Sequence, residues 1–374
     1  MAKVYDTATD LITFARLQSQ NTTSGSSYLG SDGLLKFAAE DEPRIEYGPD
    51  GSLKGLLIEE QRTNLVTHSD FSGGWGGKTQ VSLSLNSVTS PTGQQDAMVV
   101  TSSGADPHVF DFNSVSSGND YTFSVWLKGV GNTIGRSPRV WMLSTGGTVS
   151  SVVADTTPLT SEWRRYTSTG TCTASGIILS RIDFDDTGLS ASGDQVYAFG
   201  AQLEEGSFAT SYIPTSGSQQ TRSADVASIP VSAFGYNQDA GTVVVEVGNH
   251  AGATAGSQYV VSLDNSSSAE RMQVNRFNGN YILDVVDNSV SQVSASIGAG
   301  VDGSKVSFAY ALNNFVATEN GDTPVTDTTA TVPTPSKLSI GIAYNSTAQL
   351  NGHIKSIQYY PRRLTNTQLQ ELTA

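Results

Sequence analysis

Short runs in which apolar and polar residues alternate recur along this 374-residue chain, and they constrain its fold more than any other feature. In residues 121–128 large apolar side chains occupy the odd positions, while Ser124, Trp126 and Lys128 occupy the even ones. A period of two residues is that of a half-buried β-strand, whose successive side chains point to opposite faces. Gly, Pro, Asn and Asp separate these runs, so the sequence predicts an all-β fold with many turns.

The composition indicates an ordered protein with a polar, weakly charged surface. Only 15% of the residues are charged, and Ser, Thr, Asn, Gln and Gly supply most of the polarity. Large apolar residues recur along the whole chain, which argues against disorder. The formal net charge of -14, with no cluster of Lys or Arg, argues against a nucleic-acid groove because nothing would neutralise phosphates.

Cys172 is the only cysteine, so no intrachain disulfide can form. The flanking Thr171 and Thr173 predict a strand, in which Cys172 would be a small buried hydrophobe rather than a reactive thiol. The first residues contain no long apolar stretch, so no signal peptide is expected. No run approaches the ~20 apolar residues that a membrane-spanning helix needs.

The length predicts two or three domains. We expect a small N-terminal β unit over 1–64, a jelly-roll sandwich over 65–214, a polar linker over 215–225 and a second antiparallel sandwich over 226–374. Within the first unit, residues 43–65 predict a hairpin, because Gly48-Pro-Asp-Gly51 is a strong turn signal between two strands.

Beyond 121–128, strands are predicted where alternation is clear: 139–143, 162–169, 177–185, 195–203, 242–247, 258–263, 281–286, 305–312, 337–342 and 353–359. Thr365 is predicted to cap one short C-terminal helix, which would dock on a sheet through Leu369 and Leu372.

Asp183, Asp185 and Asp186 form the densest acidic cluster. Carboxylates at this spacing could hold Ca²⁺ as a structural ion, or could serve as the acid and base of a glycosidase. The third interpretation is a solvated strand end. No other cofactor is expected.

Trp126 and Trp141 are the candidate glycan platform, because each shares a strand face with polar residues. Sugar rings stack on exposed aromatic side chains flanked by hydrogen-bonding groups. The alternative is that these rings fill a sandwich core.

A catalytic role finds little support in the inventory of side chains. The histidines at positions 68, 108, 250 and 353 are scattered and match no metal or triad spacing. His353 follows an Asn-Gly turn and is expected to be a structural histidine. We therefore expect a protein that is not an enzyme, with no catalytic residues.

Three sets of motifs stand out along the chain. The first set is Ile12–Arg16, Ser31–Leu34, Pro43-Arg44, Gly55–Glu60 and Arg62–Leu65. The second set is Gly200–Glu204, Gly206–Phe208 and Thr210–Thr215, and the third is Leu350–Ile354 and Tyr359–Leu364. The first set resembles the shared N-terminal segment of bacteriophage tail and fibre proteins. The second resembles the last strand of carbohydrate-binding-module-like jelly rolls in such virion proteins, and the third resembles concanavalin A-like (laminin G-like) sandwiches.

The resemblance implies a non-enzymatic virion structural protein that presents two β-sandwiches for adhesion, host-glycan binding or capsid-surface binding. A tail or fibre location comes first, and capsid decoration or neck attachment second. Expected partners are other virion proteins, host surface glycans and further copies of the chain, with a homotrimer favoured by analogy; nucleic acid and membrane insertion are not expected. The protein would be assembled in the host cytoplasm and carried on the virion. The alternative function is a glycan-degrading tailspike-type hydrolase.

Overall fold

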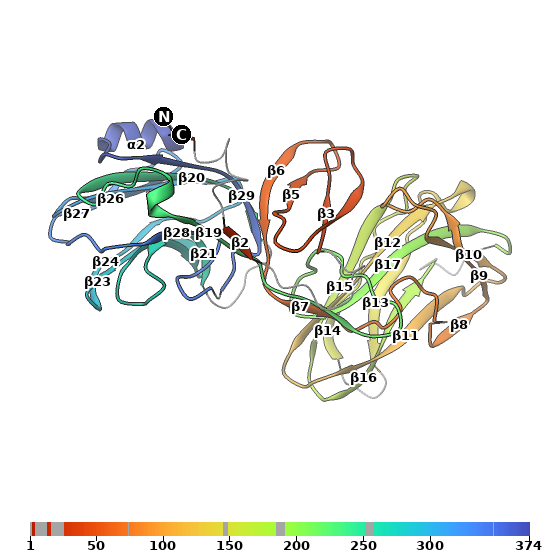
Figure 1. The fold of residues 1–374 in the computed structure, drawn as a ribbon. Helices are drawn as coiled ribbons and strands as arrows, with labels where there is room; N and C mark the ends of the chain where they lie inside the picture. Colours follow the sequence, from red (N-terminus) through yellow and green to blue (C-terminus); the bar gives the residue numbers. More distant parts are fainter. Residues whose placement is uncertain are drawn as a thin grey trace.

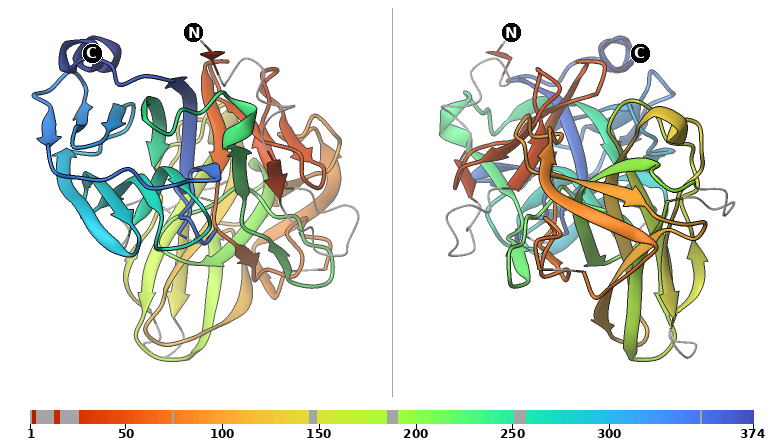
Figure 2. Two further views of the ribbon diagram at one scale, coloured as in Figure 1. Left: turned by 60° about the vertical axis from the view of Figure 1, so that its left-hand side comes forward. Right: turned by 90° about the vertical axis from the view of Figure 1, so that its right-hand side faces the viewer.

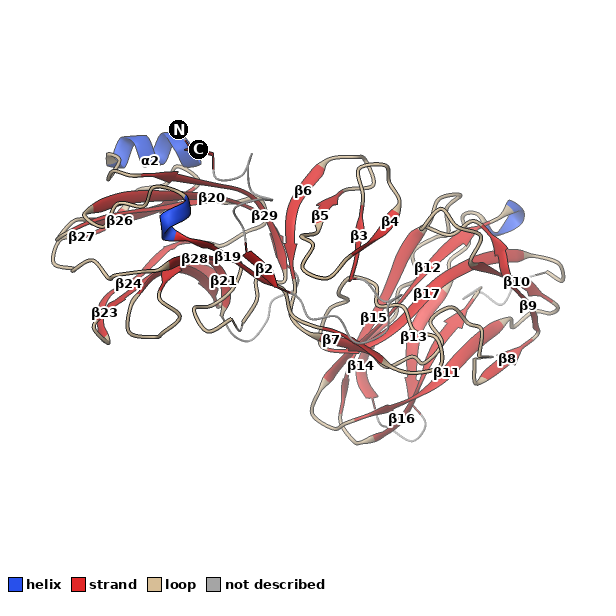
Figure 3. Cartoon of the chain, viewed as in Figure 1, coloured by secondary structure: helices blue, strands red, loops and turns tan. Residues whose placement is uncertain are grey.

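The computed structural model describes residues 2–3, 13–15, 26–73, 75–144, 149–184, 191–250, 257–346 and 348–374. Over these residues the chain is all-β, as predicted, with two antiparallel sandwiches and a single α-helix, α2 (Asn366–Thr373). Figure 1 shows the two sandwiches as separate lobes, and Figure 3 shows how completely strands dominate. No helix in these residues is long and apolar enough to cross a membrane.

The middle sandwich packs a six-stranded sheet on a four-stranded sheet. Its core includes the side chains of Tyr121, Phe123, Val125 and Leu127, each at most 2% exposed. The six-stranded sheet has the order β14 (Val149–Val153), β15 (Arg164–Cys172), β12 (Asp120–Gly129), β17 (Gln195–Glu205), β10 (Ala97–Ser102), β9 (Val81–Val88). The other has the order β13 (Arg139–Ser144), β16 (Gly176–Asp183), β11 (His108–Val115), β8 (Gly77–Thr79).

The C-terminal sandwich packs an eight-stranded sheet on a seven-stranded sheet around the larger core. The first has the order β27 (Val325–Asp327), β26 (Phe315–Glu319), β25 (Lys305–Ala311), β20 (Ala240–His250), β29 (Gly352–Tyr360), β6 (Leu53–Ile58), β5 (Ile45–Tyr47), with β1 (Ala2–Lys3) also paired to β29. The second has the order β2 (Thr13–Ala15), β19 (Val226–Pro230), β28 (Lys337–Ile340), β21 (Gln258–Asp264), β22 (Arg271–Phe277), β23 (Asn280–Asp287), β24 (Val290–Gly298).

Strands from the start of the chain complete the sandwich at its end. β6 pairs with β29, matching Leu56 to Ile354, and β2 pairs with β19. Leu56 and Ile58 accordingly lie in the C-terminal core, although about 300 residues separate them from β29. Of the strands in residues 1–64, β1, β2, β5 and β6 thus belong to the two sheets of the C-terminal sandwich, whereas β3 and β4 pair with each other. The domain bounds themselves stay predictions.

Two small sheets of two strands each lie where the lobes meet. β7 (Arg62–Asn64) pairs with β18 (Gln220–Arg222), which falls inside the segment expected to be a linker. β3 (Ser26–Leu29) and β4 (Leu35–Ala38) form a hairpin that packs through Leu35 on the outer face of the six-stranded sheet. Figure 2 shows this junction from two further directions.

The local predictions are mostly confirmed. β5 and β6 form the hairpin predicted over 43–65, and each strand predicted by alternation has a counterpart. The Thr365 hydroxyl accepts the backbone N–H of Gln368, so it caps α2, and Leu369 is fully buried beneath that helix. Many strands were not predicted, among them β8 to β11, β14, β19, β22, β24, β26 and β27. Cys172 is buried and unbonded in the described chain, and burial raises the pKa of its thiol.

Candidate functional site

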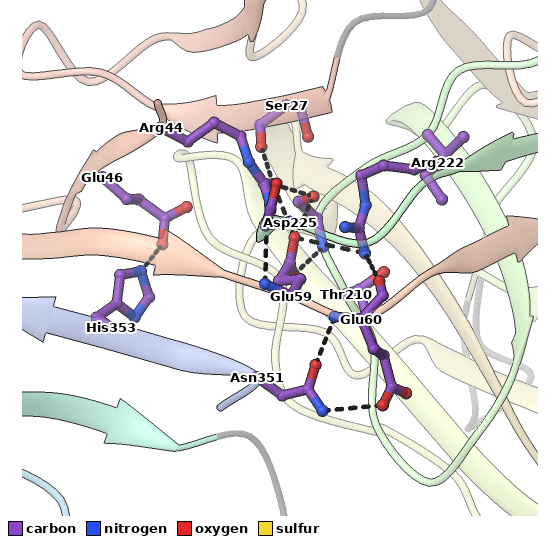
Figure 4. Close-up of polar contacts among 12 residues, drawn as sticks. Ser27, Arg44, Glu46, Glu59, Glu60, Thr210, Arg222, Asp225, Asn351 and His353 are labelled. Atoms are coloured by element: carbon purple, nitrogen blue, oxygen red, sulfur yellow. Dashed lines mark hydrogen bonds and ion pairs between the residues drawn. The ribbon is translucent and has the colours of Figure 1, made fainter. Parts of the chain in front are cut away.

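The resemblance motif at 43–65 forms a buried ionic cluster at the junction of the two sandwiches (Figure 4). The guanidinium of Arg44 is completely buried; its Nη1 donates to Glu59 Oε2 (2.7 Å) and its Nη2 donates to Asp225. Nη1 also lies 3.1 Å from the carbonyl oxygen of Ser27 and 2.7 Å from the hydroxyl of Ser211. The Arg44 side chain therefore contacts four segments. They are the β3–β4 hairpin, the residue that follows β6, the segment that follows β18, and the exit of the middle sandwich.

The charges in this cluster reinforce each other. Burial alone would raise the pKa of Glu59, but the positive charges of Arg222 and Arg44 and two hydrogen bonds from Ser211 hold it far below its ordinary value. Burial likewise opposes the charge on Arg44, and the carboxylates of Asp225 and Glu59 raise its pKa above the ordinary value. Both groups stay ionised because each desolvation cost is offset by a partner.

A second set of contacts joins the hairpin β5–β6 to the C-terminal sandwich. His353 Nε2 lies 2.7 Å from Glu46 Oε2, and His353 Nδ1 lies 2.5 Å from Asn249 Oδ1. Asn351 accepts the backbone N–H of Glu60 (2.8 Å) and donates to its carboxylate (3.0 Å). His353 is only 3% exposed with both ring nitrogens paired, which is the structural role expected of it.

Above this cluster a cleft of about 740 Å³ opens between the hairpins and both sandwiches. Its walls combine aromatic rings with hydrogen-bond donors, and they draw on residues from all three sequence regions. The lining residues include Tyr28, Lys54, Trp126, Trp163, Arg164, Arg165, Phe208 and Asn249.

Trp126 lies in the floor of this cleft. Its indole is half-buried on the outer face of the six-stranded sheet, where it meets Tyr212 edge-on (5.5 Å between centroids) and the guanidinium of Arg165 lies 4.5 Å from the ring centroid. Gly200 makes room for the ring: it has φ +65°, and an added Cβ would lie 3.0 Å from two indole carbons. Trp126 therefore both supports the sheet face and borders the cleft.

The rim of the cleft carries the more accessible groups. Trp163 is half-buried and its indole N–H donates to the carbonyl of Thr89 (3.2 Å), which fixes the ring plane. The side chains of Arg164 and Lys54 are 42% and 39% exposed, and their nearest carboxylate contacts are long, at 3.9 Å and 3.5 Å. Arg165 Nε is buried with no acceptor among the described residues.

A second hollow, of about 530 Å³, lies on the other side of the β3–β4 hairpin. It shares Leu35 and Tyr212 with the cleft, so these two side chains form the ridge between the two spaces. Its own walls include Phe37, Asp70 and Asp96.

Trp141 lies on the opposite sheet of the middle sandwich, so it cannot form one platform with Trp126. Its indole N–H donates to Asp183 Oδ2 (2.8 Å), and the guanidinium groups of Arg139 and Arg181 lie 3.8 Å and 5.6 Å from its ring centroid. These neighbours occupy much of the ring surface that a sugar would need.

Asp183 is therefore engaged by protein groups: Trp141 donates to one carboxylate oxygen and Arg181 Nε to the other (2.5 Å). Asp185 and Asp186 lie outside the described residues. Within the described residues no group of three or more His, Cys, Asp or Glu side chains is arranged to hold a metal ion. The calcium site remains a prediction.

Sequence reasoning found Trp126 but missed the groups that make the space around it. Tyr28 and Arg164 come from segments that alternation patterns treat separately, and nothing local to them indicates a shared cleft. The one sequence signal for this junction was the motif at 210–215. Ser211 in this motif bonds to Glu59, and Tyr212 bonds to Ser69.

Comparisons with known proteins give only weak likenesses. No family model and no curated protein matches the chain. Among solved structures, the carbohydrate-binding module CBM40 of a Ruminococcus gnavus IT-sialidase bound to α2,3-sialyllactose is 15% identical with a TM-score of 0.32, covering 37% of this chain and 84% of that one.

Two further structures span more of the chain. Mouse laminin α1 domains LG4-5 are 10% identical with a TM-score of 0.29, covering 71% of this chain and 88% of that one. The CBM22 tandem of Paenibacillus barcinonensis Xyn10C is 9% identical with a TM-score of 0.27, covering 79% of this chain and 97% of that one. At such low scores these likenesses carry no argument, and the fold assignment rests on the strand pairing.

Proposed function

We propose that this chain is a non-enzymatic structural protein of a bacteriophage virion that binds glycans in the 740 Å³ cleft at the junction of its sandwiches. One observation carries the binding proposal: Trp163 and Tyr28 line the same cleft as Arg164 and Lys54, two cations whose carboxylate contacts are long. Rings that stack on sugar faces, beside donors that meet sugar oxygens, are what such a ligand requires.

The virion assignment is supported by the sequence resemblance and by where its motifs lie. Arg44 and Glu59 of the N-terminal motif bind Ser211 of the middle motif directly. The motifs thus meet at one junction, which fixes how the two sandwiches are presented. A tail or fibre location is the first proposal, with capsid decoration or neck attachment second. Many copies on a particle would turn weak single sites into strong attachment.

The binding proposal is tested with the full chain on a glycan array, followed by calorimetric titration of the best ligand. We expect Trp163→Ala and Arg164→Ala each to weaken binding about tenfold, equivalent to about 1.4 kcal/mol. Trp141→Ala is the matched control, because it removes a half-buried indole from the opposite sheet. Silence on the array, or loss with Trp141→Ala alone, would overturn the cleft as the site.

Immunoelectron microscopy of phage particles tests the virion location.

A glycan-degrading hydrolase is the second candidate, favoured by one observation: Asp70 and Asp96 both line the 530 Å³ hollow. Glycosidases use two carboxyl groups across the scissile bond. Release of reducing ends from host polysaccharide, abolished by Asp96→Asn, would replace the binding proposal with this one.

A further inference from the structure

The 530 Å³ hollow beside the cleft differs from it in charge. Its described lining residues contain two carboxylates, Asp70 and Asp96, and neither Lys nor Arg. The cleft, by contrast, is lined by charges of both signs: Lys54, Arg164 and Arg165 are positive, and Glu46, Glu59 and Glu162 are negative. The two spaces share a ridge and an aromatic character, so what distinguishes the hollow is that its described lining has carboxylates and no cation to balance them.

The hollow has the surfaces that a sugar ring needs. Phe37 presents a ring that is 39% exposed, 6.4 Å from the Tyr212 ring centroid and inclined by 57° to it. The Tyr212 hydroxyl is bonded to Ser69 Oγ (2.7 Å), so that ring is fixed in the floor. An exposed aromatic ring held over a fixed floor offers a stacking face at low cost in side-chain freedom.

The carboxylates keep capacity for a ligand. Asp96 receives only two long contacts from Thr92 Oγ1, at 3.3 Å and 3.5 Å. Asp70 Oδ1 accepts from the backbone and hydroxyl of Ser72, at 3.1 Å and 2.8 Å. Within the described residues neither carboxylate has a cationic partner, although the exposed amide side chains of Asn86 and Gln94 complete the rim.

We propose that this hollow is a second glycan subsite, selective for sugar units that carry a free amino group and closed to carboxylated units. A protonated amine would form charge-assisted hydrogen bonds with Asp96 and Asp70, whereas a ligand carboxylate would face two like charges. The proposal rests on the proposed function for its ligand class, glycans, and adds a separate site that prefers cationic sugar units.

The test is calorimetric titration of the full chain with glucosamine oligomers at mildly acidic pH, where the amine is charged. N-acetylglucosamine oligomers are the neutral comparison and galacturonic acid oligomers the carboxylated one. We expect the glucosamine oligomer to bind at least tenfold more tightly than either. Asp96→Asn and Phe37→Ala should each weaken it about tenfold, and added salt should weaken it in the wild type more than in Asp96→Asn.

Glu371→Gln is the matched control, because it removes one negative charge from the exposed face of α2. Equal losses with Asp96→Asn and Glu371→Gln would show non-specific attraction to an acidic protein and would overturn the subsite. So would equal binding of the galacturonic acid oligomer. Trp163→Ala separates the two proposals, because Trp163 lines the cleft and not the hollow. If no cleft ligand is found, but glucosamine binding survives Trp163→Ala and depends on Asp96 and Phe37, the cleft fails and the hollow stands.

Discussion

Arg44 has no solvent exposure and contacts two carboxylates, so its removal should be among the most damaging single changes. Arg44→Met would leave Glu59 and Asp225 buried without the guanidinium that contacts both of them. Breaking a buried pair from one side costs about 3–5 kcal/mol, and we expect a loss of that order in the free energy of unfolding measured with urea.

Lys36→Met is the control for this prediction. Lys36 pairs with Asp32 at 3.0 Å, but both side chains are more than 40% exposed, so the unfolding free energy should barely change. Similar losses in the two variants would contradict the view that burial gives the Arg44 cluster its weight.

At the same scale, the sequence predicted which way side chains point but not what they meet. Alternation correctly placed Phe123 in a core and Trp126 on the opposite face, because the period of a strand is local. It could not reveal that Arg44 meets Asp225, 181 residues away, or that Arg164 and Tyr28 share a cleft. Such contacts depend on strand pairing between distant segments.

At the scale of elements, the pairing of β6 with β29 depends on Gly55. This residue has φ +119°, and an added Cβ would lie 2.4 Å from the carbonyl oxygen of Ile354, a backbone atom that cannot move aside. β5 and β6 were predictable as a hairpin from their turn, but this close approach to β29 was not, because the partner strand lies about 300 residues further along the chain.

We therefore expect Gly55→Ala to detach β6 from the C-terminal sheet. The measurement is amide hydrogen exchange, in which the β6 amides should lose protection selectively. Gly51→Ala is the control: Gly51 also has positive φ, at +77°, but nothing lies within 4 Å of its added Cβ. If β6 protection survives Gly55→Ala, or falls equally in both variants, the steric explanation is wrong.

At the scale of the whole molecule, Glu59 is the tie between the two sandwiches. It follows β6 of the C-terminal sandwich and accepts two hydrogen bonds from Ser211, at 2.8 Å and 2.7 Å, at the exit of the middle sandwich. With this tie intact the sandwiches should unfold together, in a single calorimetric transition. Glu59→Gln removes the charge that Arg44 and Arg222 share, so we expect two separate transitions.

The same carboxylate should make this coupling sensitive to acid. Because the pKa of Glu59 is held below its ordinary value in the folded state, its ionised form contributes stability above about pH 4.5, and that contribution is lost as the pH falls toward the folded pKa. Burial raises the pKa values of Asp264 and Glu319, which act in the opposite direction, so total stability alone is not diagnostic.

The difference in unfolding free energy between the wild type and Glu59→Gln should shrink from about pH 6 to about pH 3. Glu162→Gln, at the exposed rim of the cleft, should show no such trend. A pH-independent difference for Glu59→Gln would mean that the junction is held by packing and strand pairing rather than by its buried charges.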